Sequence, residues 1–396
     1  MVDEGIALGG VERMLLGLMP ELSEACENLV WMMPAHRLAP SSEGLPLNSG
    51  VIFESFHWPH WNTAKLKTAI IKRIARFLKR FNSTYAGTLE QYLFNERLEQ
   101  IIRKYQITHV LYPALFIQPF PRVPVPVFAS VMDINYHPSW RDECTANLNA
   151  WAKQANQLLT ISKFTKNEIE QICSHANGKV AAIPIASDAV SSWQSSIDAR
   201  VAASLYYPAS FNPHKGHALL IKALQQLHEA DMDFRLTLTG SGTLSLNSKI
   251  PLDIPELEVA RQLVAAAPDS FYQKIDVRGM VTTEEVEICY AHANLVILPS
   301  SYEGFGLPLA EAVARGKRVV CADIPAFREQ VALYGFEEAV NFVPGINTSA
   351  WASAIQVAMR QPPQSPYTSE ELREIFARRT WESVAIDYIR VLRQWS

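Results

Sequence analysis

Short apolar runs alternate with longer amphipathic stretches along most of this chain. The runs have the length and the β-branched content of buried strands, and the stretches between them have helical periodicity. Strands that are apolar throughout belong to parallel sheets covered by helices on both faces. The pattern therefore predicts an α/β fold. We expect strands at 108–112, 125–133, 157–161, 179–185, 201–207, 234–239, 274–279, 295–299, 318–322 and 341–343, and helices at 88–104, 163–173, 215–229 and 283–291.

Two such α/β units account for the length of 396 residues. We expect the first over 1–195 and the second over 196–375. The polar stretch 187–200 is the predicted linker between them. A helical stretch at 370–394 is expected to end the chain.

One segment, Glu-Gly-Phe-Gly-Leu-Pro-Leu-Ala-Glu at 303–311, closely follows a predicted buried strand. It reads as a glycine-bearing loop and then a helix with Pro308 at its first position, where proline is favoured. Leu307 cannot cap the first-turn N–H groups with its side chain. Uncapped N–H groups at the positive end of a helix bind anions, and Gly304 and Gly306 allow a ligand to approach the backbone closely. The segment therefore predicts a phosphate site.

Two carboxylates, Glu303 and Glu311, flank this predicted phosphate site. Carboxylates repel phosphate, so they must contact another part of the ligand, and hydroxyl groups are the natural partners. The apolar neighbours of Glu311 indicate a buried acid, which costs free energy unless it has a polar partner. A phosphate held by backbone N–H groups beside acids that accept from hydroxyls describes a nucleotide sugar.

Together with Tyr-Pro-Ala-Ser-Phe-Asn-Pro-His-Lys-Gly at 207–216, the 303–311 segment resembles the retaining glycosyltransferases of family 4, which have the GT-B fold. The resemblance implies two Rossmann-like domains facing across a cleft, with the donor bound mainly to the second domain. The C-terminal helix, within 376–396, is expected to cross back to the first domain. Further matching pieces are Gly9-Gly10, 160–165, 238–240, 278–281 and Trp381.

The resemblance also implies roles for individual residues. Glu311 would hold the ribose hydroxyls, Glu303 the hydroxyls of the donor sugar, and Lys215 would neutralise the diphosphate leaving group. Transfer would retain the anomeric configuration, and no protein nucleophile is assigned. The phosphates are assigned to the N–H groups of Phe305, Gly306 and Leu307 beside Gly304, further donor contacts to Ser210, Gly240, Met280, Gly9 and Gly10, and the acceptor side to Asp133 and His137.

Two positions depart from the pattern of that family. The family usually has an arginine five residues before the lysine, and this chain has Ser210 there. The family often has His-Asp after the middle strand of the first domain, and this chain has Met132-Asp133. One positive charge on the leaving group and one histidine near the reacting sugar are therefore absent from their usual positions.

Composition excludes several other classes of function. The formal net charge of −4 argues against nucleic acid as the main partner. The five cysteines are scattered without a Cys-x-x-Cys pair, as expected in a reducing compartment. No apolar run approaches the roughly 18 residues that span a bilayer, and the N-terminus lacks the features of a signal peptide. We expect a cytoplasmic protein.

No metal and no cofactor are expected. Asp231-Met-Asp233 imitates the metal-binding acid pair of a different transferase fold. It lies in a predicted turn, far in sequence from the other site residues. We interpret it as a solvated turn.

The segment 58–82 has an unusual charge pattern. Between Thr63 and Asn82 it has seven basic residues and no acid, while its apolar residues share one helical face. One interpretation is an amphipathic helix that covers the first sheet with a solvated basic face. The other is docking on an anionic membrane surface, at the inner face of the membrane. Both interpretations stay open.

These observations favour a retaining glycosyltransferase that uses a GDP- or UDP-linked sugar, with mannosyl as the favoured type. The acceptor is expected to be a saccharide or a lipid-linked saccharide in cell-surface glycan synthesis. The alternatives are another GT-B enzyme, such as a sugar-nucleotide epimerase, and a catalytically silent GT-B protein that binds a nucleotide.

Overall fold

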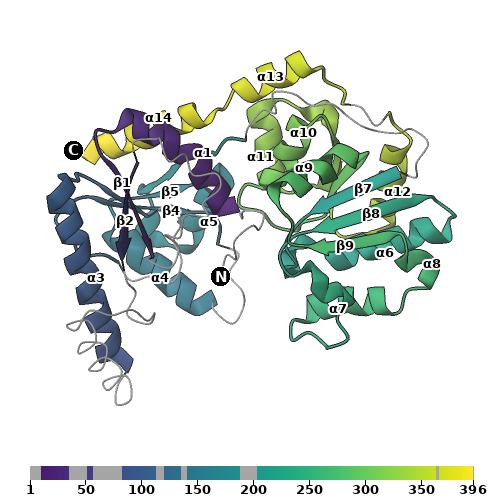
Figure 1. The fold of residues 1–396 in the computed structure, drawn as a ribbon, viewed down its shortest axis with the longest axis horizontal. Coiled ribbons are helices and arrows are strands. Elements are labelled where there is room, and N and C mark those ends of the chain that lie inside the picture. The colour runs from purple at the N-terminus through teal and green to yellow at the C-terminus, as the bar shows by residue number, and fades with distance from the viewer. Residues whose placement is uncertain are drawn as a thin grey trace. The chain divides into compact units, whose positions relative to one another are not determined.

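The structure is a computed structural model, and its described residues form two compact units, shown in Figure 1. The N-terminal unit contains Val11–Pro184 together with Trp381–Ser396, and the C-terminal unit contains Ile185–Thr380. The predicted domain boundary at residue 195 lies outside the described residues. The residues that the structure describes are 10–34, 51–56, 83–112, 120–134, 141–187, 203–362 and 365–395.

The N-terminal unit is built on a parallel sheet with the strand order β3-β4-β5-β6. Trp151 is fully buried at its core, and its ring meets those of Tyr112 and Phe120 edge-on at centroid distances of 4.8 and 5.1 Å. The strands are β3 (Val110–Tyr112), β4 (Val127–Val131), β5 (Gln157–Thr160) and β6 (Val180–Ala182). The helices are α1 (Gly10–Ala25), α3 (Ser83–Tyr105), α4 (Arg141–Gln154), α5 (Lys163–Ile172) and α14 (Trp381–Leu392).

A second, two-stranded parallel sheet in this unit was not predicted. It pairs β1 (Leu29–Pro34) with β2 (Val51–Phe56). Glu54 interrupts the apolar pattern of β2, which hides the strand from a search for buried runs. In the folded unit this carboxylate accepts from the side chains of Arg97, Lys104 and Tyr105 on α3, at 2.8, 2.8 and 2.6 Å.

The C-terminal unit contains a six-stranded parallel sheet with the order β12-β11-β10-β7-β8-β9. The strands predicted at 234–239 and 318–322 are observed with the same bounds. The strands are β7 (Ala203–Pro208), β8 (Phe234–Thr239), β9 (Ile275–Gly279), β10 (Leu295–Leu298), β11 (Arg318–Ala322) and β12 (Val340–Val343). The helices are α6 (His217–Glu229), α7 (Pro255–Ala265), α8 (Asp269–Tyr272), α9 (Thr283–His292), α10 (Leu307–Ala314), α11 (Pro325–Tyr334), α12 (Thr348–Met359) and α13 (Ser369–Ala377).

Helices cover both faces of this sheet. α6 packs against α7 and α12 on one face, and α9, α10 and α11 lie on the other (Figure 1). Every residue of β10 is buried between these two layers. The apolar character of the central strands follows from this double cover.

The end of the chain forms two helices where one continuous stretch at 370–394 was predicted. α13 begins at a capping box between Thr368 and Glu371 and ends at Ala377, and α14 begins at Trp381. α14 packs closely on α1, because a Cβ atom added at Gly17 would lie 2.2 Å from the Trp381 ring. Glycine at this position therefore permits the contact between the two helices.

No helix in the described ranges is both long enough and apolar enough to cross a membrane. The whole basic segment 58–82 lies outside those ranges, so both interpretations of that segment remain predictions.

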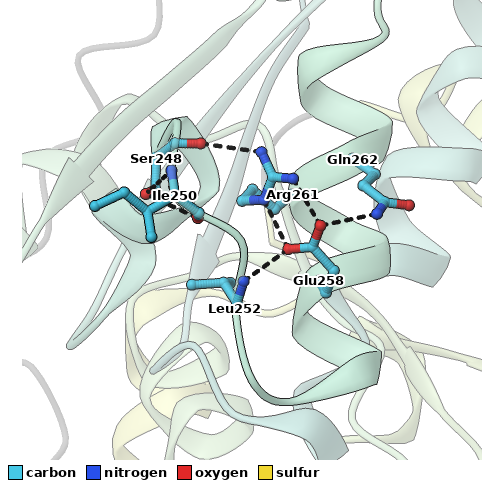
Figure 2. A network of polar contacts seen from close by, with 6 residues as sticks. All are labelled: Ser248, Ile250, Leu252, Glu258, Arg261 and Gln262. Atoms are coloured by element: carbon cyan, nitrogen blue, oxygen red, sulfur yellow. Dashed lines mark hydrogen bonds and ion pairs between the residues drawn. The ribbon is translucent and has the colours of Figure 1, made fainter.

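A polar network, shown in Figure 2, fixes the loop that leads from β8 into α7. Arg261 makes two hydrogen bonds to Glu258, at 2.7 and 2.6 Å, and donates to the carbonyl oxygen of Ser248 at 3.1 Å. Glu258 also accepts from the N–H of Leu252 at 2.9 Å. These hydrogen bonds, led by those from Arg261, lower the pKa of Glu258 to about 2.

The lowered pKa of Glu258 predicts a pH-dependent stability. Since the carboxyl is more acidic in the folded chain than in the unfolded one, its contribution is present above about pH 4.5 and is lost as the pH falls towards 2. We expect Glu258→Gln to lower the melting temperature at pH 7 and to have a smaller effect at pH 3. Glu256→Gln removes an exposed acid from the same helical turn, and an equal effect of both variants at pH 7 would contradict the assignment.

Candidate active site

The topology of the six-stranded sheet marks one place for a ligand. β7 pairs with β10, yet the chain leaves β7 towards β8 and leaves β10 towards β11, in opposite directions along the sheet. In open α/β sheets, ligands bind outside the carboxyl ends of the strands at such a switch point. The loops that follow β7 and β10 are the segments predicted to bind the donor.

The loop after β7 is held close to its neighbours by backbone contacts. Gly240 has φ 136°, and a Cβ atom there would lie 2.3 Å from the carbonyl oxygen of Ala209. Ser210 is half-buried in this loop, and its hydroxyl accepts from the side-chain amide of Asn212 at 2.8 Å. Ser210 and Gly240, both predicted as donor contacts, therefore belong to adjacent loops at the same edge.

Lys215 does not lie in the first turn of an α-helix, as the predicted helix at 215–229 implied. It ends a short 3₁₀ turn, Pro213–Lys215, and α6 begins only at His217. Gly216 between them is left-handed, with φ 74°, and a Cβ atom there would lie 2.3 Å from the carbonyl oxygen of Pro299. This close approach brings the lysine to the loop that follows β10.

The two residues predicted to carry the chemistry are in contact. Lys215 Nζ lies 2.6 Å from Glu303 Oε1, although the residues are 88 positions apart in the sequence. Their side chains are 15% and 11% exposed, so the pair is only partly open to water. A backbone hydrogen bond joins the same two loops, because His214 O accepts from the N–H of Ser301 at 2.8 Å.

Burial keeps the two histidines beside Lys215 neutral. It lowers the pKa of His214 to about 4 and that of His217 to about 3, and the charge of Lys215 adds to both shifts. The ring of His217 packs between those of Tyr207 and Phe211, each at a centroid distance of 5.0 Å. At pH 7 neither ring adds positive charge, so Lys215 supplies the charge of this loop.

The loop after β10 leads into α10 without a side-chain cap. Gly306 is the N-cap in a left-handed conformation, with φ 86°, and makes no side-chain cap bond. α10 begins at Leu307, so Pro308 is the second residue of the helix and not the first, as predicted. Within the described part of the chain, the N–H groups of Phe305, Gly306 and Leu307 donate no hydrogen bond. These donors are suited to an anion.

Glu311 is buried in α10, as its apolar neighbours predicted, with 9% of its surface exposed. Tyr290 OH on α9 donates to Glu311 Oε2 at 3.3 Å. The Tyr290 ring is held edge-on by Tyr206, at 4.9 Å, and carries the Arg315 guanidinium over its face, at 4.7 Å. A packed aromatic group therefore contributes to the orientation of the carboxylate.

The remaining predicted residues fall in three places. Gly304 is buried in the loop before α10, and Met280, 42% exposed, follows β9 at the same edge of the sheet. Gly10 begins α1, and Asp133 is exposed after β4 in the N-terminal unit. Gly9 and His137 lie outside the described residues.

No group of three or more His, Cys, Asp or Glu side chains that could hold a metal ion occurs among the residues that the structure describes. The expectation of a metal-independent reaction remains a prediction, to be tested with a chelator.

The sequence of the second unit matches a known family of domains. Residues 202–379 match the family Glycosyl transferases group 1. This glycosyl transferases group 1 domain covers every strand of the six-stranded sheet and all the residues of the switch-point site. The assignment to family 4 is finer than this match and remains a prediction.

Known proteins resemble the whole chain in fold and half of it in sequence. O-antigen chain mannosyltransferase B of Escherichia coli is 27% identical over 223 residues, which span 54% of this chain and 55% of that relative. The structure of Anabaena Alr3699/HepE in complex with UDP and glucose has a TM-score of 0.63 at 13% identity and covers 99% of this chain and 98% of its own. The structure of WaaG, a glycosyltransferase involved in lipopolysaccharide biosynthesis, has a TM-score of 0.63 at 11% identity with the same coverage. The predicted GT-B fold is confirmed.

Several residues around the site were not predicted. Tyr290, Arg315 and Gln330 contact the site residues from α9, the end of α10 and α11. Nothing in the local sequence indicates a role for Tyr290 or Gln330, because each acts through a contact that exists only after the helices pack. For Arg315 the sequence offers one signal, its spacing of four residues from Glu311 on the same helical face.

Proposed function

We propose that this protein is a retaining glycosyltransferase of family 4 type. It moves a sugar from a nucleotide diphosphate sugar to a saccharide or lipid-linked saccharide acceptor in cell-surface glycan synthesis. One observation carries the proposal: the Lys215–Glu303 contact lies at the switch point, where the uncapped turn before α10 and the buried Glu311 follow in the same segment. A cation, free N–H donors and two acids are the groups that a nucleotide sugar requires.

Each part of the donor then has a partner. The N–H groups of Phe305, Gly306 and Leu307 bind the diphosphate, and Lys215 neutralises the charge that grows on it. Glu311 accepts from the ribose hydroxyls, with Tyr290 fixing the orientation of its carboxylate. Glu303 accepts from hydroxyls of the sugar, and its contact with Lys215 links the sugar site to the phosphate site.

In the proposed step, the acceptor oxygen attacks the anomeric carbon on the face from which the diphosphate leaves. The bond between the anomeric carbon and the phosphate oxygen breaks, the new glycosidic bond forms, and a phosphate oxygen takes the acceptor proton. The protein stabilises the departing diphosphate electrostatically, by groups already in place before the reaction. Lys215 and the turn before α10 are these groups.

The donor and the acceptor are proposed from the relatives. Similarity to a mannosyltransferase of Escherichia coli supports a mannosyl donor for this chain. The structure of the Anabaena protein, by contrast, contains UDP and glucose. We therefore propose a GDP- or UDP-linked hexose. For the acceptor side we keep the assignment of Asp133 and His137 that the resemblance implies, and we propose a cytoplasmic site of action, peripheral at the inner face of the membrane through residues 58–82.

A second candidate is a catalytically silent GT-B protein that binds a nucleotide. Ser210 favours it, because the structure places a neutral hydroxyl, already bonded to Asn212, where the family usually has an arginine. Such a protein would bind the nucleotide through the same turn without turnover. Another GT-B enzyme, such as an epimerase, would turn over the donor without any acceptor.

A thermal-stability panel tests the proposal. It contains UDP, GDP, ADP, dTDP, CMP and their common sugar conjugates, without metal. A ligand at 100 times its dissociation constant adds about 2.7 kcal/mol of stability, which raises the melting temperature of a domain of this size by several degrees. We expect one diphosphate series to stabilise the wild type, with GDP or UDP leading. Absence of any shift contradicts the proposal.

Chelation tests the expected metal independence. Because Lys215 and backbone N–H groups supply the positive potential at the diphosphate, we expect sugar transfer to continue at an unchanged rate in EDTA. The rate is measured as nucleoside diphosphate released, before and after dialysis against the chelator. A loss that Mg²⁺ or Mn²⁺ restores would show that a metal ion shares the role of Lys215.

A further inference from the structure

Gln330 is a buried polar residue for which neither the sequence motifs nor the proposed chemistry has a use. It lies on α11 and is fully buried. Its amide nitrogen donates two hydrogen bonds, one to the carbonyl oxygen of Phe305 and one to that of Gly306, the latter at 2.9 Å. Both acceptors belong to the turn that leads into α10. A single side chain from another helix thus holds two successive carbonyls of the proposed phosphate site.

These two bonds, together with the hydrogen bond that Gly306 O accepts from the N–H of Leu309 at 3.0 Å, determine where the N–H groups of the turn point. The described peptide bonds are all trans, and in a trans peptide the N–H points opposite to the C=O. The carbonyl of Phe305 shares a peptide with the N–H of Gly306, and the carbonyl of Gly306 shares one with the N–H of Leu307. Because both carbonyls face Gln330, both N–H groups face away from α11. If either peptide rotated, a carbonyl oxygen would face the phosphates and repel them.

The shape of the turn matches this contact. Gly306 is left-handed, and a Cβ atom there would lie 2.4 Å from Cε1 of Phe327 and 3.3 Å from the amide nitrogen of Gln330. Phe327 and Gln330 are three residues apart and therefore share one face of α11. The turn is pressed against this face, and glycine is the residue that fits.

Packing alone does not account for Gln330. Its Oε1 atom is buried without a hydrogen-bond partner among the described residues, and an unpaired buried acceptor costs free energy. An apolar side chain of equal size would avoid that cost but could not donate to the two carbonyls. The donated bonds are what a glutamine adds at this position.

We infer that Gln330 is a positioning residue, which fixes the two peptide groups that join residues 305–307 and so directs the N–H groups of Gly306 and Leu307 at the donor diphosphate. The inference rests on the proposed function, since it assumes that this turn binds the diphosphate. Gln330 itself does not touch the ligand. It acts through the orientation of the turn.

The experiment compares ligands with and without the diphosphate. Affinities of the full chain for GDP, guanosine, UDP and uridine are measured by calorimetry, for the wild type and for Gln330→Met. Methionine keeps the length of the side chain and removes the donor. We expect the affinity for the preferred diphosphate to fall about tenfold, the equivalent of one hydrogen-bonded charge contact, and that for its nucleoside to change less than twofold.

A matched control separates positioning from stability. Tyr334→Phe also removes a buried hydrogen bond from α11, the one that Tyr334 OH accepts from the N–H of Ser187 at 3.0 Å. It lies away from the turn, so we expect a lowered melting temperature and an unchanged ratio of diphosphate to nucleoside affinity. Gln330→Glu, which keeps the polar group but loses the donor when ionised, serves if the methionine variant does not fold.

The outcomes distinguish the inference from the function on which it rests. If the wild type binds neither GDP nor UDP, the proposed function fails and the inference fails with it. If the wild type binds one of them and Gln330→Met binds it equally well, the inference alone is overturned. An equal loss of affinity for the diphosphate and the nucleoside also overturns the inference, because it would show that the substitution disturbs the whole binding unit and not the phosphate site alone.

Discussion

Replacement of Lys215 by methionine is expected to lower kcat by about 10²–10³-fold, the usual effect of removing one preorganised group that stabilises developing charge. The loop after β7 has no other ionised cation at pH 7, since His214 and His217 stay neutral and Ser210 stands where the family has an arginine. The loss should be in kcat more than in KM, because the charge on the diphosphate grows as the bond breaks. The measurement is steady-state release of the nucleoside diphosphate.

A structural contribution of the same residue has to be separated from this effect. Removing Lys215 leaves Glu303 without its cation, and its side chain is only 11% exposed, so the variant should lose about 1–3 kcal/mol of stability. The double variant Lys215→Met/Glu303→Gln should recover part of that stability and none of the activity. Lys222→Met, on the exposed face of α6, is the charge-matched control. A kcat of Lys215→Met within threefold of the wild type would refute the role.

Replacement of Glu311 by glutamine is expected to weaken binding of the donor nucleotide by about 10–100-fold, the range for a hydrogen bond to a charged group. The Glu311 residue is 9% exposed and its carboxylate receives a hydrogen bond from Tyr290, so the packed α9 and α10 helices fix the orientation of this carboxylate. Because the proposed partners of Glu311 are ribose hydroxyls, the substitution should weaken binding only of nucleotides that carry these hydroxyls. Calorimetric titration with the ribonucleotide and with its 2′,3′-dideoxy form measures this directly.

The wild type should prefer the ribonucleotide, and Glu311→Gln should bind both forms with similar, weak affinity. Glu284→Gln removes an exposed acid on α9 and should leave the preference intact. If the wild type does not distinguish the two sugars, Glu311 holds some other part of the ligand. If only the variant's melting temperature changes, the acid is structural.

Much of the C-terminal unit could be predicted from the sequence. Its central strands β10 and β11 are almost entirely buried and apolar, so they stand out against the amphipathic helices around them, and the strands at 234–239 and 318–322 match the prediction in both bounds. The turn before α10 was also visible, because two glycines, a proline and the lack of a capping side chain are all local signals. What the local pattern missed by one residue was the start of the helix, at Leu307.

The N-terminal unit was harder to predict. β2 contains Glu54, and an acid within a short apolar run argues against a buried strand when α3 cannot be seen beside it. The position of Lys215 was also wrong in the prediction, since the helix expected at 215–229 begins only after Gly216. The glycine is needed for the approach to Pro299, which is a tertiary contact.

The residues that orient the site residues were the hardest to predict from the sequence. The 2.6 Å contact of Lys215 with Glu303 depends on the pairing of β7 with β10, strands far apart in the chain. Tyr290 and Gln330 reach the site from separate helices. Local sequence can therefore mark the groups that would touch a ligand, whereas the groups that orient them appear only once the helices have packed.

The most direct test of the central claim is the anomeric configuration of the transferred sugar. The donor that stabilises the protein is incubated with it and with a glycolipid extract as acceptor, and proton NMR follows the anomeric signals of donor and product through the reaction. We expect a product that keeps the α configuration of an α-linked donor, formed in step with release of the nucleoside diphosphate. A β-linked product, or a donor that binds without being consumed, would contradict it.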